Sequence, residues 1–453
     1  MDFSQSSWLV LAALAFVGAV LLAAAANWIR RENLCLFFWA VLLAHRNVLP
    51  RQLAAITELS PSSSLLTIEA GVTTVVFAVT LALLISGPAA RRKRLPRTLR
   101  LLCFYAAAVT VTCLWSHNRL YSAFWAMRLW CVALLPALYF QSSDSPTKPQ
   151  TFMWATVVGL IPTFALQWIG LLTSGFSADG RVYAFWIGAV WPSIVAFSLA
   201  SGYVIKLVQS PKPATACLAL LFIANGVIGG SKTGGAACLA SVGILALSNS
   251  KRFLRPSVLA SACGLVAVLI VAVPRDVGLV GHLTYQHGSL DTVNDRVDLW
   301  KTAVIPRILQ SPVVGSGFAT SSVERLTSEY GWEAGHAHNG VLNSLVEVGI
   351  VGSLPLFLAI LSILGRICWR ARWMTTDPVT SWMVAAWICL LISGSVELTF
   401  GGSLQPPVYL FYALTISIDA ASRTRQGSAP HVGSARAGLG LIHRPARPVA
   451  VVA

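Results

Sequence analysis

The chain has unusually few charged residues. Asp, Glu, Lys and Arg make up 11% of its 453 residues, whereas they make up roughly a quarter of an ordinary soluble domain. Hydrophobic residues make up 56% of the chain, and the mean hydropathy is +0.70. A water-soluble fold of this length could not bury so much apolar surface. The composition therefore excludes a soluble enzyme and predicts that the bilayer surrounds most of the protein.

Acidic residues are especially scarce. The 17 Asp and Glu stand against 33 Lys and Arg, which gives a net charge of +16. This excess does not indicate nucleic-acid binding, because most Lys and Arg fall in short loops between apolar runs, where they orient transmembrane helices. No acidic residue follows Asp419, and the remaining segment is rich in Gly, Pro, Ser and Arg. We predict a disordered, basic cytoplasmic tail over residues 419–453.

The long polar segment of the chain contains no cysteine. All nine cysteines lie in or at the ends of apolar runs, which argues against a disulfide framework or a cysteine metal site and favours small buried hydrophobic side chains. The first apolar run also has no basic segment before it and no cleavage site after it. We interpret it as a retained membrane segment, not a signal peptide.

Thirteen apolar runs have lengths suited to transmembrane helices. They are Trp8–Trp28, Asn33–Leu49, Ser64–Ser86, Leu101–Trp115, Tyr121–Phe140, Thr151–Thr173, Val182–Ile205, Ala214–Gly229, Thr233–Ser248, Pro256–Val273, Val341–Leu364, Ser381–Val396 and Leu404–Ile418. The second run is short. If it spans, there are thirteen helices and an outside N-terminus; if it lies in the interface, there are twelve and both termini are inside. We predict an all-α polytopic membrane protein of about twelve, or else thirteen, transmembrane helices.

The basic residues fix the orientation of these helices. The densest basic loop, Arg91–Arg100, is assigned to the cytoplasm, and alternation then places residues 274–340 outside as one loop of about 67 residues. Apolar residues at helical spacing predict an amphipathic helix from Asn294 to near Gln310 in this loop. The expected divisions are residues 1–273 (helix bundle), 274–340 (large, partly helical periplasmic loop), 341–418 (C-terminal helices) and 419–453 (tail).

Four cations are candidates for an anion site. Arg296 begins the loop helix and either pairs with a neighbouring aspartate or clamps a phosphate. Lys232 lies in the outer turn Ser231–Gly234, where it either extends to the interface or presents charge beside a helix N-terminus. Arg128 lies within an apolar run, where arginines are costly and usually paired or functional. Arg181 ends an outer loop, so together the four could line an outward-facing basic cavity.

The segment His336–Gly340 closes the polar loop at the membrane boundary. A zinc site lacks further ligands at suitable spacing, which leaves a helix-capping role or a proton-accepting role for His338. Glu347 lies nine residues beyond His338, half a turn out of phase on a straight helix. It is therefore expected to pack against a neighbouring helix. Glu397 is another candidate partner of His338, and the sequence does not choose between the two.

The order of motifs resembles a known superfamily. A Ser-Lys-Thr-Gly turn (Ser231–Gly234) precedes Asp-Arg-x-x-x-Trp (Asp295–Trp300), Pro-x-x-Gly-x-Gly (Pro312–Gly317) and His-Asn-x-x-Leu-x-x-Leu-x-Glu-x-Gly-x-x-Gly (residues 338–352). This pattern is similar to the O-antigen ligase and polymerase superfamily of bacterial inner-membrane glycosyltransferases. The resemblance implies a twelve-helix protein with a large periplasmic loop over a lipid-open cavity.

The resemblance also implies an activity. Ligases of this superfamily move a glycan from undecaprenyl diphosphate onto lipid A–core oligosaccharide, without nucleotide sugar, cofactor or required metal. The family's loop histidine and arginine match His338 and Arg296, whereas its usual Ser-Arg-Thr is Ser231-Lys232-Thr233 here, which keeps the charge but loses bidentate geometry. We expect a monomer or weak oligomer.

The resemblance assigns a role to each candidate residue. His338 would take a proton from the acceptor hydroxyl, and Arg296 would stabilise the departing diphosphate in a single, inverting displacement. Further diphosphate contacts are expected at Arg181, Lys232 and Arg128, and supporting positions at Asn339, His336, Glu347 and Glu397.

Two other functions compete with the ligase. A polymerase would extend glycan on the lipid carrier, and the short motifs do not separate it from a ligase; one dominant outer loop favours the ligase. A transporter or flippase would line its path with Arg128 and Glu397, but such proteins commonly contain internal repeats, and none is evident.

Overall fold

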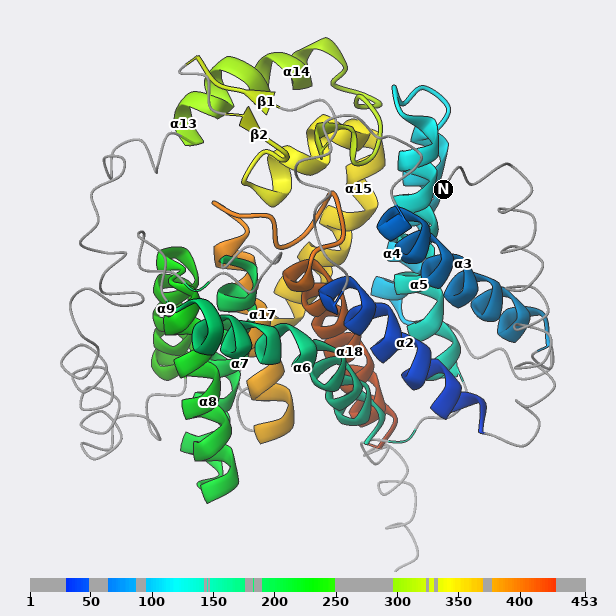
Figure 1. Ribbon diagram of the computed structural model, residues 1–453. Helices are drawn as coiled ribbons and strands as arrows, with labels where there is room; N and C mark the ends of the chain where they lie inside the picture. Colours follow the sequence, from blue (N-terminus) through cyan, green and yellow to red (C-terminus); the bar gives the residue numbers. More distant parts are fainter. Residues whose placement is uncertain are drawn as a thin grey trace, which may run out of the picture.

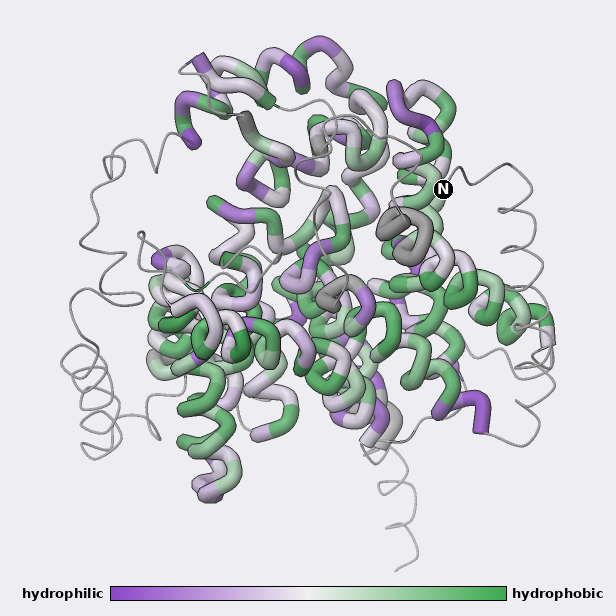
Figure 2. The backbone as a smooth tube through the Cα atoms, viewed as in Figure 1, coloured by the Kyte–Doolittle hydropathy of each residue, from purple (hydrophilic) through white to green (hydrophobic). Residues whose placement is uncertain are grey.

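The computed structural model describes residues 30–48, 64–86, 95–141, 145, 147–175, 182, 190–248, 296–322, 326–329, 333–369 and 377–428. Its helical bundle consists of α2 (Arg31–Val48), α3 (Ser64–Ile85), α4 (Arg97–Thr112), α5 (Arg119–Gln141), α6 (Lys148–Ser174), α7 (Val190–Gln209), α8 (Pro213–Gly229), α9 (Lys232–Ser248), α15 (Gly340–Trp369), α17 (Pro378–Ser393) and α18 (Pro406–Ser428). Figure 1 shows these helices packed side by side, and Figure 2 shows that hydrophobic residues dominate most of them.

Eleven of the thirteen predicted runs correspond to these helices. The runs Trp8–Trp28 and Pro256–Val273 lie outside the described residues, and so does the predicted boundary between the helix bundle and the large loop at residue 273. Among those that are described, α5, α6, α7 and α15 are long and apolar enough to cross a membrane. A mostly helical chain with four candidate membrane spans among the described residues is thus confirmed, while the number of spans stays a prediction.

Ion pairs and hydrogen bonds of one buried carboxylate connect the predicted cytoplasmic ends of three helices, α4, α15 and α18. Asp419 is fully buried. One of its carboxylate oxygens accepts hydrogen bonds from the backbone and hydroxyl of Thr98, at 2.9 and 2.6 Å, at the start of α4. The other pairs with Arg366 of α15 at 2.5 Å and Arg423 at 3.1 Å. Helix α18 continues through Asp419 and on to Ser428, so the first residues of the segment that the sequence assigned to a disordered tail are helical.

A second ion pair orients α2. Lys148, at the start of α6, donates to the carbonyl of Tyr139 near the end of α5 at 2.8 Å and pairs with Glu32 at 3.2 Å. The Arg31 guanidinium donates to the carbonyl of Leu83 near the end of α3. The first turn of α2 therefore lies beside the start of α6 and the end of α3. Helix α2 accordingly runs antiparallel to α3, which is the direction expected if this short helix spans the membrane.

The loop before α15 has a small core of its own. A continuous helical segment runs through α13 (Arg296–Leu299), the π-helical turn η4 (Trp300–Val304) and α14 (Ile305–Gln310), which confirms the predicted amphipathic helix. The π turn precedes Pro306, which lacks an N–H and clashes with a regular preceding turn. The strands β1 (Leu326–Thr327) and β2 (Glu333–Ala334) pair antiparallel and lie beside this helix over the upper end of α15 (Figure 1).

A break in α15 joins this loop to the bundle. Gly349 has φ +67° inside the helix, and the Pro312–Gly317 turn supplies the hydrogen bonds lost there. The N–H groups of Ser316 and Gly317 donate to the carbonyls of Val346 and Glu347, both at 2.9 Å. The N–H groups of Ile350 and Val351 donate to the carbonyls of Pro312 and Val313, at 2.9 and 3.1 Å.

Glycines make this close docking possible. A Cβ on Gly315, also at positive φ, would lie 2.5 Å from the Glu347 backbone, and one on Gly349 would lie 2.4 Å from the Val313 carbonyl. Only glycine has both the conformational freedom and the space for these positions. The Pro-x-x-Gly-x-Gly and Glu-x-Gly motifs are therefore the two sides of one junction.

Candidate active site

Residues 337–339 form a tightly held turn before α15. The carbonyl of Ala337 accepts from the Trp300 indole at 2.7 Å, and its N–H donates to the side-chain oxygen of Asn343 at 3.0 Å. Asn339 caps α15, because its side-chain oxygen accepts from the N–H groups of residues 341 and 342 at 2.9 and 3.0 Å. Between these anchors His338 has φ +48°, an uncommon conformation that the surrounding hydrogen bonds maintain.

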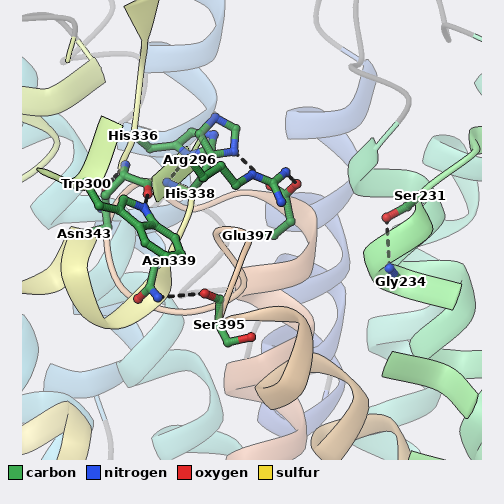
Figure 3. Close-up of polar contacts among 11 residues, drawn as sticks. Ser231, Gly234, Arg296, Trp300, His336, His338, Asn339, Asn343, Ser395 and Glu397 are labelled. Atoms are coloured by element: carbon green, nitrogen blue, oxygen red, sulfur yellow. Dashed lines mark hydrogen bonds and ion pairs between the residues drawn. The ribbon is translucent and has the colours of Figure 1, made fainter. Parts of the chain in front are cut away.

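One carboxylate joins the two residues that the sequence singled out. Nδ1 of His338 lies 3.2 Å from Oε2 of Glu397, and the other oxygen of Glu397 pairs with the guanidinium of Arg296. The side chains are 19% (His338), 11% (Arg296) and 5% (Glu397) exposed, so the cluster is largely shielded from solvent. Figure 3 shows the three side chains meeting at Glu397. We call them the Arg–Glu–His triad.

The triad sets the tautomer of His338. A carboxylate can only accept hydrogen bonds, so Nδ1 carries the hydrogen that it shares with Glu397. Nε2 is then the ring nitrogen that can take up a proton. A histidine oriented in this way by a carboxylate is suited to accept a proton from a substrate hydroxyl.

Backbone contacts hold Glu397 in register with His338. Glu397 follows α17 in the segment that leads to α18. The N–H of Gly340 donates to the Gly394 carbonyl at 2.8 Å, and the side-chain amide of Asn339 donates to the Ser395 carbonyl at 2.7 Å. The start of α15 therefore lies against the end of α17, and this junction fixes both His338 and Glu397.

His336 supports the turn. Its Nδ1 accepts from the backbone N–H of His338 at 3.2 Å, and the two imidazole rings are 4.0 Å apart. The ring of Trp191, in the first turn of α7, is 6.3 Å from the His336 ring. The contact with Trp191 brings α7 next to the histidine turn.

The first turn of α7 also contacts the Ser231–Gly234 turn. The Ser193 hydroxyl, two residues beyond Trp191, accepts from the Ser231 N–H at 3.0 Å and donates to the Gly226 carbonyl at 2.6 Å. Ser231 in turn accepts from the Gly234 N–H at 3.0 Å and caps α9. Lys232 thus lies at the same end of the bundle as the triad, with α7 between them, and Figure 3 shows Ser231 well to one side of His338.

Arg128 lies in the interior of the bundle. It is fully buried, its Nε donates to the Tyr409 hydroxyl at 3.1 Å, and one terminal nitrogen is 3.2 Å from Nε2 of His45. The guanidinium also lies 5.0 Å from the Trp125 ring. These contacts connect Arg128 to α2 and α18 and not to the triad. Arg181 lies outside the described residues.

Glu347 has a different environment from Glu397. It is buried, and Oε1 accepts from the Ser321 hydroxyl at 2.6 Å. Within the described part of the chain, its second oxygen and the side-chain nitrogen of Asn343 have no hydrogen-bond partner. Both atoms lie close to Gly402, where a Cβ would be 3.2 Å from the Glu347 oxygen and 2.0 Å from the Asn343 nitrogen. Glu347 thus contacts Ser321, whereas Glu397 contacts His338.

Two residues near the site were missed from the sequence. Asn343 had a usable signal, because Asn339, Asn343 and Glu347 recur every four residues and so share one face of α15. Trp191 gave no usable signal in the sequence, since a single tryptophan at a membrane boundary is common.

Residues 217–357 match a family model described as O-antigen ligase. The matched segment contains Lys232, Arg296, His338 and Glu347, whereas Glu397 lies beyond its end. None of the curated proteins matches the chain.

Proposed function

We propose, because residues 217–357 match a family model described as O-antigen ligase, that the chain moves O-antigen glycan from undecaprenyl diphosphate onto lipid A–core oligosaccharide. The observation that carries the proposal is the Arg–Glu–His triad, a shielded base and cation at one end of a membrane helix bundle. In this proposal that end faces the periplasm of a bacterial inner membrane.

The triad supports a single displacement. Nε2 of His338 takes the proton of the acceptor hydroxyl as its oxygen bonds to the anomeric carbon. The bond from that carbon to the diphosphate oxygen breaks, and the electron pair leaves with undecaprenyl diphosphate. Because the reaction is a single displacement, the anomeric centre inverts. Glu397 holds the imidazole and stabilises the imidazolium that forms. Diphosphate is a good leaving group, so the step needs neither a general acid nor a cofactor, and we expect it to be metal-independent.

Cations balance the charge on the leaving group. Arg296 shares Glu397 with the base and is the main candidate, because a guanidinium fork matches phosphate oxygens. Lys232 and Arg181 are proposed as further contacts, with Lys232 placed at the same end of the bundle by its neighbour Ser231. Arg128 supports the proposal less well, since its contacts lie inside the bundle.

A deletion strain tests the reaction. A ligase is indicated if long glycan disappears from lipid A–core while polymer still accumulates on the undecaprenyl carrier. Loss of polymer from the carrier would instead identify a polymerase and contradict the proposal. Transfer between two lipids by purified protein in detergent, where no gradient exists, would exclude a transporter.

A further inference from the structure

The carboxylate of Glu397 contacts two residues that have different tasks. Oε1 pairs with Arg296 and Oε2 with Nδ1 of His338. In the proposed reaction, Arg296 binds the donor diphosphate and His338 activates the acceptor. The same group therefore contacts both the donor side and the acceptor side of the site.

The Arg296 pair must change when a donor binds. A carboxylate and a diphosphate compete for the same guanidinium donors, and the diphosphate carries more charge. Because Glu397 is largely buried, its charge is poorly screened by water and must be balanced by a nearby cation. His338 becomes one such cation when it accepts a proton.

We propose that donor binding draws Arg296 from Glu397 to the diphosphate, which removes the Arg296 charge from the carboxylate and so strengthens its pairing with His338. This inference rests on the proposed function and adds a regulation of the same site. With Arg296 on Glu397, the negative charge is shared and stabilises an imidazolium weakly. With Arg296 on the diphosphate, more of the carboxylate charge acts on His338. The base is then strongest only when a donor is present to receive the acceptor oxygen.

Glu397→Gln separates this coupling from a simple orienting role. The substitution keeps the shape of the side chain and removes the competitor for Arg296. The probe is undecaprenyl diphosphate without glycan, and its affinity is measured for protein in lipid nanodiscs. We expect Glu397→Gln to bind the probe about tenfold more tightly, which corresponds to about 1.4 kcal/mol, while glycan transfer falls by at least about tenfold. Opposite changes in affinity and turnover are not expected from misfolding.

Two controls make the test specific. Asp298→Asn removes a neighbouring negative charge that lies two residues from Arg296; it should change affinity less than about twofold. In an Arg296→Gln background, Glu397→Gln should no longer tighten binding, because the contested cation is gone. Glu397→Asp retains the charge and should keep an affinity near that of the wild type, with lower turnover, if the site remains folded.

The outcomes distinguish the two proposals. Unchanged or weaker probe binding by Glu397→Gln, in a variant that unfolds at the wild-type temperature, overturns the coupling. Equal tightening by Asp298→Asn, or tightening that persists without Arg296, overturns it as well. Failure of the wild type to bind the probe and to transfer glycan overturns the proposed function itself.

Discussion

At the scale of single residues, Glu397 decides how the site is organised. Sequence reasoning found His338 and Arg296 but could not choose between Glu347 and Glu397 as the partner of the histidine. The contact with Glu397 spans 59 residues, and no local spacing encodes it. Helical phase correctly argued against Glu347 as the partner of His338, and a side-chain oxygen of Glu347 accepts a hydrogen bond from Ser321 instead. Local patterns can thus reject a partner on the same helix, whereas a partner on another helix requires the fold.

Replacing Arg296 tests its dual role. We expect Arg296→Ala to raise the donor KM by about tenfold or more, because a cation for the diphosphate is lost, and Arg296→Lys to raise it less. Initial rates against donor concentration in nanodiscs provide the measurement. Equal and negligible effects of the two substitutions would mean that Arg296 serves only its ion pair with Glu397.

Asn343 should act through the histidine turn. Its side-chain oxygen accepts from the Ala337 N–H, so Asn343→Ala should loosen His338 and lower kcat by about tenfold, equivalent to about 1.4 kcal/mol, with donor KM within about twofold. Ser344→Ala, at the next and equally buried position, is the matched control and should retain activity. A loss of expression or of donor binding in Asn343→Ala would indicate a general structural role.

At the scale of elements, most helices were predictable and their interruptions were not. Long apolar runs identified the helices because lipid leaves few alternatives for the backbone. The break at Gly349 was missed, since the Pro312–Gly317 turn pairs with the residues on either side of Gly349 across 30 or more positions of the chain. The π turn at Trp300–Val304 was also missed, although Pro306 gave a local reason for it.

The junction at Gly349 can be tested against a glycine in the same helix. Gly349→Ala should destabilise the protein by about 2 kcal/mol or more, because the backbone is strained for any other residue and the added Cβ would lie 2.4 Å from a carbonyl oxygen. Gly365→Ala meets nothing within 4 Å and should be neutral or slightly stabilising. Thermal unfolding in detergent compares them, and equal unfolding temperatures would contradict the account of the junction.

At the scale of the whole molecule, the two ends of the bundle have different tasks. One end holds the triad, and the other holds the Asp419 ion network that joins α4, α15 and α18. The sequence predicted opposite ends for these groups from the positive-inside rule. It did not predict that the last helix continues through Asp419, because only the folded bundle brings Arg366 and Thr98 to that carboxylate.

Asp419 should therefore contribute to stability and not to chemistry. Asp419→Asn removes a buried carboxylate that pairs with two partly exposed arginines and should cost about 2 kcal/mol, while the donor KM of the folded protein stays unchanged. Asp377→Asn is a suitable control, because Asp377 only caps α17 and its loss should cost about 1 kcal/mol or less. A changed donor KM in folded Asp419→Asn would contradict the separation of the two ends.

The most direct test of the central claim is glycan transfer by purified protein carrying His338→Ala. With undecaprenyl diphosphate-linked glycan and lipid A–core supplied in detergent, the wild type should transfer glycan. His338→Ala should be slower by at least about a hundredfold, although it still inserts, folds and binds the donor. Transfer by His338→Ala at a rate near that of the wild type would contradict the assignment of His338 as the base.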